Sequence, residues 1–120
     1  MKFNAKTFLI CVISLMTLLS KAETPLWLRG NAISPDGKTI AFSYKGNIFT
    51  VNANGGNASQ LTYDSSYDNT PIWSPDGKWI AFSSNRNGHM DIYVIPANGG
   101  NSRKITKGAA NKYPITFRDE

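Results

Sequence analysis

The sequence contains two copies of one motif, and this repeat restricts the fold more than any other feature. Residues 34–38 and 74–78 both have the sequence Ser-Pro-Asp-Gly-Lys, and each is followed after one residue by Ile-Ala-Phe-Ser. A second shared motif, Ala-Asn-Gly-Gly, ends at Gly56 and again at Gly100. The copies are therefore about 40–45 residues apart, a period typical of β-propeller blades when each copy holds several short strands.

The residue pattern of each copy predicts four strands and no helix, so we expect the chain after its first 22 residues to be all-β. The expected strands are a short run ending at residue 33 or 73, then residues 39–43 or 79–83, 47–51 or 91–95, and 60–62 or 104–106. Proline fixes φ and glycine accepts a positive φ, so a turn is predicted before the second strand of each copy. The turn residues are Ser34, Pro35, Asp36 and Gly37 in the first copy, and Ser74, Pro75, Asp76 and Gly77 in the second.

The alternation of side chains along a strand predicts which residues form the core. Ile40 and Phe42 share one face of the second strand, as do Ile80 and Phe82 in the next copy, and all four are expected to be buried. The third strand of each copy is apolar on both faces. This pattern favours a sheet covered on both sides, as a blade between two neighbours is.

A third copy of the repeat starts near the end of the sequence but is not completed there. Residues 112–117 match residues 69–74, but no Ser-Pro-Asp-Gly follows them. Propellers have about 4–8 blades, so two blades cannot close a ring. We therefore expect the remainder of a longer polypeptide, or partner chains, to complete the propeller. The predicted division is a signal peptide at 1–22, one blade at 23–66, a second at 67–110, and the start of a third repeat at 111–120.

The first 22 residues have the features of a secretory leader. Lys2 and Lys6 precede an apolar run at 7–19, which at 13 residues is shorter than the roughly 20 needed to span a bilayer. Ser20 and Ala22 fit a cleavage site between Ala22 and Glu23. We expect a helical leader and an exported protein, periplasmic or secreted, that meets the membrane only during export. A membrane anchor is the less favoured alternative.

Removal of the leader also changes the composition. The chain has one cysteine, Cys11, which leaves with it, so disulfides are not expected. Lys plus Arg falls from 13 to 10 against 8 acidic residues, and the net charge falls from +5 to +2. The remaining basic residues form no stripe, which argues against a nucleic-acid partner.

The repeats resemble those of TolB-like and tricorn-protease-like propellers. The residues that carry the resemblance are 34–38 and 74–78, the Ile-Ala-Phe-Ser after each, 91–94, both Asn-Gly-Gly turns, 61–62 and 105–106. The opening at 25–37 is most similar to the start of exported tricorn-like serine peptidases. This resemblance implies a non-catalytic propeller that admits or filters peptide substrates for a peptidase region absent from this chain. The alternatives are a TolB-like periplasmic protein-binding propeller and a truncated, non-functional fragment.

No catalytic constellation is predicted within the chain, so whether it belongs to an enzyme rests on the resemblance. His89 is the only histidine, no Gly-x-Ser-x-Gly elbow exists, and the sequence has no metal motif. We expect His89 to be an exposed loop residue and expect no cofactor. Asp36 and Asp76 occupy equivalent turn positions, and we interpret them as turn-forming residues and not as catalytic acids.

Three further patterns have structural interpretations. Arg86 and Asp91 flank one hairpin and predict a local ion pair. Trp73 and Trp79 lie at repeat positions, which favours packing between blades over a peptide-binding platform. Residues 57–59, Asn-Ala-Ser, fit a glycosylation sequon.

Overall fold

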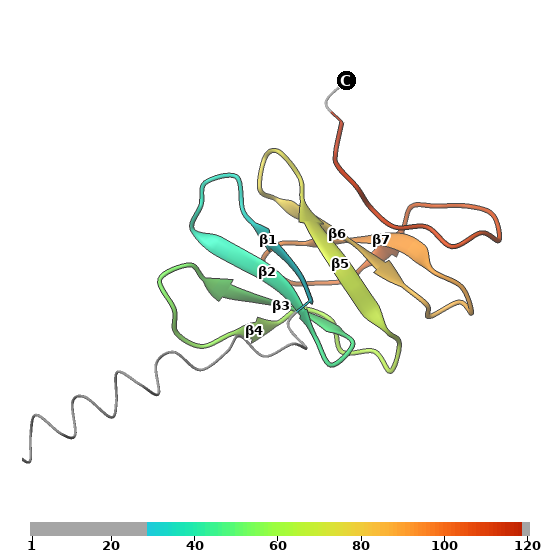
Figure 1. Cartoon of the computed structure of the whole chain (residues 1–120), viewed down its shortest axis with the longest axis horizontal. Helices are drawn as coiled ribbons and strands as arrows, with labels where there is room; N and C mark the ends of the chain where they lie inside the picture. Colours follow the sequence, from blue (N-terminus) through green and yellow to red (C-terminus); the bar gives the residue numbers. More distant parts are fainter. Residues whose placement is uncertain (1–28, 119–120) are drawn as a thin grey trace, which may run out of the picture.

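The computed structural model describes residues 29–118, which fold into two four-stranded antiparallel sheets lying side by side (Figure 1). The prediction of two four-stranded blades is confirmed. The first sheet, blade 1, contains β1 (Arg29–Ile33), β2 (Thr39–Tyr44), β3 (Asn47–Asn52) and β4 (Ser59–Gln60). The second, blade 2, contains β5 (Asp68–Trp73), β6 (Trp79–Ser84), β7 (Asp91–Pro96) and β8 (Arg103–Lys104). The predicted leader and its cleavage site lie outside the described residues.

Both blades are meanders in which each strand pairs with the next along the chain. The turn before β2 is closed by the Gly37 amide, which donates to the Ser34 carbonyl at 2.8 Å. Gly37 has φ 73°, in the left-handed region that favours glycine, and Gly77 in the equivalent turn has φ 70°. The Ser34 hydroxyl donates to Asp36 Oδ1 at 2.6 Å and accepts from the Thr39 amide at 3.0 Å, and the second turn repeats these contacts. The side chains of this motif therefore stabilise the turns through local hydrogen bonds.

The core lies between the blades. One face of β2 and β3, carrying Ala41 and Ile48, packs against the face of β6 and β7 that carries Ile80, Phe82 and Ile95. Each of these five side chains is at most 2% exposed. The inner strand β5 also contacts β1, β2 and β3 of the preceding blade. The hydrophobic contacts between the two sheets thus fix how blade 2 sits on blade 1.

The burial prediction is correct for blade 2 and wrong for blade 1. Ile80 and Phe82 are fully buried, whereas Ile40 and Phe42 are only half-buried. The reason is position, because Ile40 and Phe42 lie on the face of blade 1 that points away from blade 2. No other described element packs on that face.

The hydrogen bonds at the exit from blade 2 repeat those at its entry. At the entry, the Asp68 amide donates to the Gly46 carbonyl at 2.8 Å, and Ser43 Oγ donates to the Asp68 carbonyl at 2.9 Å. At the exit, the Lys112 amide donates to the Met90 carbonyl at 2.8 Å, and Ser83 Oγ donates to the Lys112 carbonyl at 3.0 Å. Residues 112–117 therefore lie against blade 2 as the start of β5 lies against blade 1, although they form no strand.

Candidate functional site

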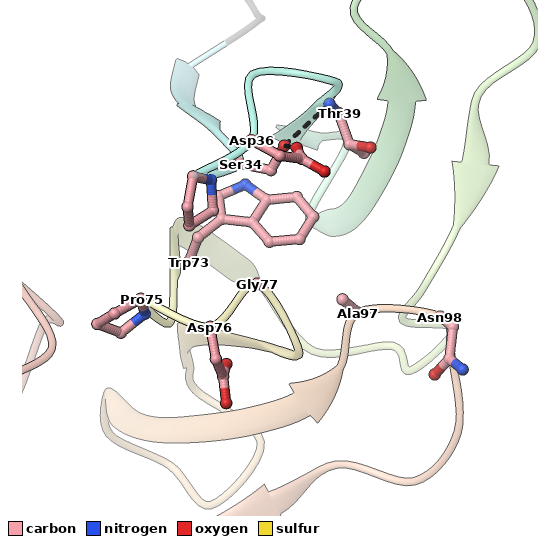
Figure 2. A pocket seen from close by; sticks show the side chains of 10 residues that line it. Ser34, Asp36, Thr39, Trp73, Pro75, Asp76, Gly77, Ala97 and Asn98 are labelled. Atoms are coloured by element: carbon pink, nitrogen blue, oxygen red, sulfur yellow. Dashed lines mark hydrogen bonds between the residues drawn. The ribbon is translucent and has the colours of Figure 1, made fainter.

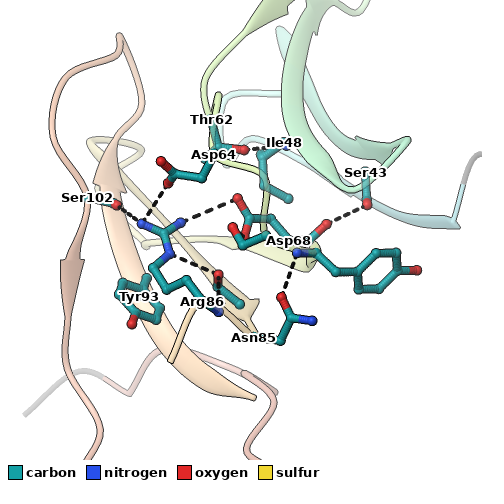
Figure 3. A network of polar contacts seen from close by, with 12 residues as sticks. Ser43, Ile48, Thr62, Asp64, Asp68, Asn85, Arg86, Tyr93 and Ser102 are labelled. Carbon is teal, nitrogen blue, oxygen red and sulfur yellow. Dashed lines mark hydrogen bonds and ion pairs between the residues drawn. The ribbon is translucent and has the colours of Figure 1, made fainter. Parts of the chain in front are cut away.

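The most connected polar group in the described chain is Arg86, at the junction between the blades (Figure 3). Arg86 lies in the loop between β6 and β7, and Asp64 lies in the connection from β4 to β5. Arg86 Nη1 is 3.0 Å from Asp64 Oδ2, and Nη2 is 3.4 Å from Asp68 Oδ2. Nε and Nη1 also donate to the hydroxyls of Ser84 and Ser102, at 2.9 and 2.8 Å. Arg86 therefore ties the connection between the blades to three parts of blade 2.

Packing fixes the orientation of the guanidinium group. Arg86 Cζ lies 4.3 Å from the centre of the Tyr93 ring and 5.7 Å from that of Phe82, within the range of a cation–π interaction. The Arg86 side chain is 20% exposed and that of Asp68 is fully buried. This cluster has a structural role, because its donors and acceptors are used within the fold.

The predicted ion pair between Arg86 and Asp91 is wrong. The β6–β7 loop carries Arg86 back over Tyr93, toward the entry to blade 2, while Asp91 faces Lys104 and His89. Its Oδ2 lies 2.7 Å from Lys104 Nζ and 3.1 Å from His89 Nε2. The sequence analysis missed Asp64 and Asp68 because they belong to a connection without a repeated motif. The one available signal was the change from Asp68 to Asn111, the residue that precedes the matching segment 112–117 in the next copy.

Asp91 is the centre of a second polar cluster. Its side chain is fully buried, and the Thr106 hydroxyl donates to Oδ1 at 2.9 Å. Oδ2 lies beside Lys104 and His89 and has no hydrogen bond of good angle. The ammonium group of Lys104 is the main cause that lowers the pKa of Asp91 below its ordinary 3.8, and the Thr106 hydroxyl and His89 act in the same direction. The carboxylate is therefore ionised at neutral pH.

His89 lies in the β6–β7 loop, as expected, but its side chain is only partly exposed. Its side chain is 30% exposed, and besides Asp91 its Nε2 lies 3.0 Å from the Gly108 carbonyl oxygen. An acid and a histidine are thus adjacent, as in part of a hydrolase triad. The hydroxyl in this cluster belongs to Thr106, however, and it donates to the carboxylate of Asp91. The described residues contain no hydroxyl bonded to His89, so this pair lacks a nucleophile to activate.

The two Ser-Pro-Asp-Gly turns border a cleft of about 590 Å³ at the other end of the strands (Figure 2). Trp73 forms its inner wall and donates from Nε1 to the Ala32 carbonyl of blade 1 at 2.9 Å. The hydrogen bond from Ser34 is the main cause that lowers the pKa of Asp36, and the bond from Ser74 does the same for Asp76. Both carboxylates are exposed, and each also accepts a bond from a backbone amide of its own turn.

The two tryptophans have different environments. Trp73 packs against the core between the blades, as its repeat position predicted. Trp79 lies on the opposite face of blade 2 and is 36% exposed, with Arg103 Cζ 5.7 Å from its ring centre. The packing prediction for Trp79 stays a prediction, because the face that it occupies has no neighbouring blade among the described elements.

The part of the chain that the structure describes has no cluster of His, Cys, Asp or Glu suited to a metal ion. Residues 29–118 also include no helix that is long and apolar enough to cross a membrane.

Comparison with known proteins identifies the family. The model of the tricorn protease N-terminal β-propeller domain matches residues 25–120. The chain belongs to this family. It is 32% identical over 72 residues to tricorn protease homolog 1 of Streptomyces coelicolor, covering 60% of this chain and 7% of that protein. It is 41% identical over 71 residues to dipeptidyl-peptidase 5 of Porphyromonas gingivalis, covering 51% and 10% respectively.

This chain of the tricorn-type propeller family is also similar to a solved structure, the putative TolB from Agrobacterium tumefaciens. The TM-score is 0.65 at 30% identity, and the match covers 68% of this chain and 31% of that one. The chain spans only 7–27% of the length of the curated relatives first matched. The residues described here are thus two blades of the tricorn-type propeller domain.

Proposed function

We propose that this chain is the non-catalytic propeller segment of an exported tricorn-like serine peptidase, in which it admits or filters peptide substrates. The family match over residues 25–120 is the observation that carries the proposal. The local chemistry agrees with it, because the chain's only histidine contacts a carboxylate and a carbonyl oxygen, and no hydroxyl bonds to it in the described residues. In this proposal, hydrolysis is carried out by a peptidase region beyond these blades.

The loop between β6 and β7 is the candidate for contact with an entering peptide. It is four residues longer than the turn between β2 and β3, and it presents Asn85, Asn87 and Gly88 to solvent. Polar, exposed loops on a rigid scaffold are where binding residues concentrate. His89 lies near the end of this loop, and its contacts with Asp91 and Gly108 hold the loop against the exit from blade 2.

The test uses the full-length polypeptide encoded by the gene. We expect it to cleave peptides, and we expect His89→Ala to change the preference between short fluorogenic peptides and unfolded casein while short-peptide turnover stays within about twofold. Lys38→Ala, at the opposite end of the strands, is the matched control and should change neither. Full-length protein that cleaves no peptide, or a His89→Ala variant with unaltered length preference, would contradict the filtering role.

A TolB-like protein-binding propeller is the second candidate, favoured by the likeness to the putative TolB from Agrobacterium tumefaciens. Here the propeller binds other proteins of the cell envelope and no peptidase region exists. The same full-length preparation distinguishes the two candidates. The TolB-like candidate requires that the polypeptide has no peptidase activity and that it forms a stoichiometric complex with a purified envelope protein.

A further inference from the structure

A polar pocket of about 470 Å³ lies at the junction of the two blades, beside the Arg86 cluster. Its lining side chains are all polar or charged: Asp64, Ser65, Ser66, Asn85, Arg86 and Asn87. The first three belong to the connection from β4 to β5, and the last three belong to the β6–β7 loop. Because both segments belong to the junction between blades 1 and 2, the pocket is independent of what packs on the outer faces of the blades.

Two exposed asparagine side chains of this pocket are held in fixed orientations by bonds within the fold. Asn85 Oδ1 accepts from the Tyr67 amide at 2.7 Å, so its Nδ2 group is a donor without a partner among the described residues (Figure 3). Asn87 Nδ2 donates to Tyr93 Oη at 2.7 Å, and its Oδ1 is likewise an acceptor without a partner there. The pocket therefore presents a pre-oriented donor and a pre-oriented acceptor, and a ligand that pairs with both loses little binding energy in ordering them.

The charged groups of the pocket are already paired with each other. Asp64 Oδ2 lies 3.0 Å from Arg86 Nη1, and Arg86 Nη2 also contacts the buried Asp68. A charged group of a ligand would have to compete with these ion pairs. None of the six lining residues is apolar, whereas pockets that hold apolar groups are lined predominantly by hydrophobic side chains. The pocket therefore suits neutral groups that form hydrogen bonds.

A second pocket adjoins the first, which favours an extended ligand over a compact one. Its volume is about 380 Å³, and Asp64 and Arg86 line both pockets. The second pocket also contains the side chains of Leu61, Tyr63 and Ile95, so it offers the apolar surface that the first pocket lacks. A chain that crosses the ion pair between Asp64 and Arg86 would therefore meet a polar site and then a partly apolar one.

From these features we propose that the polar pocket binds the main chain of an extended peptide. Asn85 Nδ2 donates to a peptide carbonyl, and Asn87 Oδ1 accepts from a peptide amide. Each non-proline residue of a peptide supplies one such donor and one such acceptor, whatever its side chain. Recognition at this pocket is therefore independent of peptide sequence and requires a main chain that is not already paired. The site rests on the proposed function, which supplies the peptide, and it adds which part of that peptide is recognised.

The test is the binding of a short alanine–serine peptide, with blocked ends and a fluorescein label, to the full-length polypeptide, measured by fluorescence anisotropy. Treatment with phenylmethylsulfonyl fluoride beforehand inactivates a serine peptidase, so that the peptide is not consumed. N-methylation of the peptide's main-chain amides removes its donors and keeps its side chains, and it should raise the Kd about tenfold. Exchange of one serine of the peptide for lysine or glutamate should change the Kd by less than about threefold, because the site forms no bond to that side chain.

Two variants of the pocket add the same charge but differ in the hydrogen bond that they offer. Asn85→Asp still accepts from the Tyr67 amide but puts an oxygen in place of the donor, so the Kd should rise about tenfold. Asn87→Asp keeps an acceptor for the peptide and can accept from Tyr93 Oη, so the Kd should stay within about twofold. Both residues are exposed, so both variants should fold, as circular dichroism can check. Asn54→Asp, in the exposed turn between β3 and β4, is the control outside the pocket and should bind as the unaltered protein does.

Equal weakening in the two pocket variants would indicate an effect of charge alone and would overturn the proposal. A peptide that does not bind, or that binds no more tightly than its N-methylated form, overturns it as well. Failure of the proposed function looks different. A polypeptide that shows the expected binding pattern but cleaves no peptide supports the main-chain site and contradicts the peptidase, whereas cleavage without this pattern overturns the site and leaves the peptidase standing.

Discussion

Replacing Arg86 by methionine tests whether the junction between the blades depends on its ion pairs. Asp68 is fully buried, and Arg86 is the cation that contacts its carboxylate, at 3.4 Å. Ser66 Oγ then supplies the remaining side-chain hydrogen bond, at 3.0 Å. Breaking a buried ion pair by removing one partner costs about 3–5 kcal/mol, because the other charge remains in a low-dielectric site.

The contact of Arg86 with Tyr93 adds a smaller contribution. A cation–π interaction at a partly buried site contributes about 0.5–2 kcal/mol, and methionine keeps part of the packing on the ring. Methionine offsets this smaller loss in part, so we expect the lost ion pair to dominate and Arg86→Met to lower the free energy of unfolding by about 3–5 kcal/mol. For a domain of this size, 3 kcal/mol corresponds to a decrease in Tm of roughly 12–24 °C.

The assay is urea and thermal unfolding of the full chain, followed by circular dichroism at neutral pH. Arg103→Met is the matched control, because Arg103 is exposed and contacts one ring at 5.7 Å, and it should cost less than about 1 kcal/mol. Asp68→Asn in the Arg86→Met background should recover part of the loss, since it removes the unpaired charge. A loss no larger than that of the control, or a double variant as unstable as the sum of its parts, would refute the reasoning.

Three further predictions rest on the structure and a fourth rests on the sequence alone. Gly77→Val should cost about 1–3 kcal/mol in urea unfolding, because a β-branched residue is strained at positive φ, whereas Lys78→Val beside it should cost much less. The pKa of Asp91 is lowered on folding, so its contribution to stability is present above its ordinary 3.8 and is lost as the pH falls through the native value. Unfolding measured between about pH 5 and pH 2 should therefore depend less on pH in Asp91→Asn than in the unaltered chain. The purified chain should leave casein and short fluorogenic peptides intact, and cleavage abolished by His89→Ala would contradict this. Mass spectrometry of exported protein should find Glu23 at the amino terminus, and intact leader in the soluble fraction would disprove the cleavage site.

Local chemistry made the strands and turns predictable from the sequence. Each Ser-Pro-Asp-Gly motif contains its own constraints, because proline restricts φ, glycine accepts positive φ, and the serine and aspartate side chains bond within the turn. The period of about 40–45 residues then indicated blades, since each copy supplies four short strands. None of these features depends on what lies beside the sheet. The sequence by itself therefore determined the strands, their turns and the class of fold.

The tertiary structure decided which surfaces and charges meet. Ile40 and Ile80 occupy the same place in the repeat, yet only Ile80 is fully buried, because burial depends on the blade that lies alongside. Arg86 likewise is close in sequence to Asp91 but contacts Asp64 and Asp68. A long side chain on a loop can reach several carboxylates, and the packing of its guanidinium group on Tyr93 selects among them. Such choices depend on the relative position of two sheets, which a local pattern does not encode.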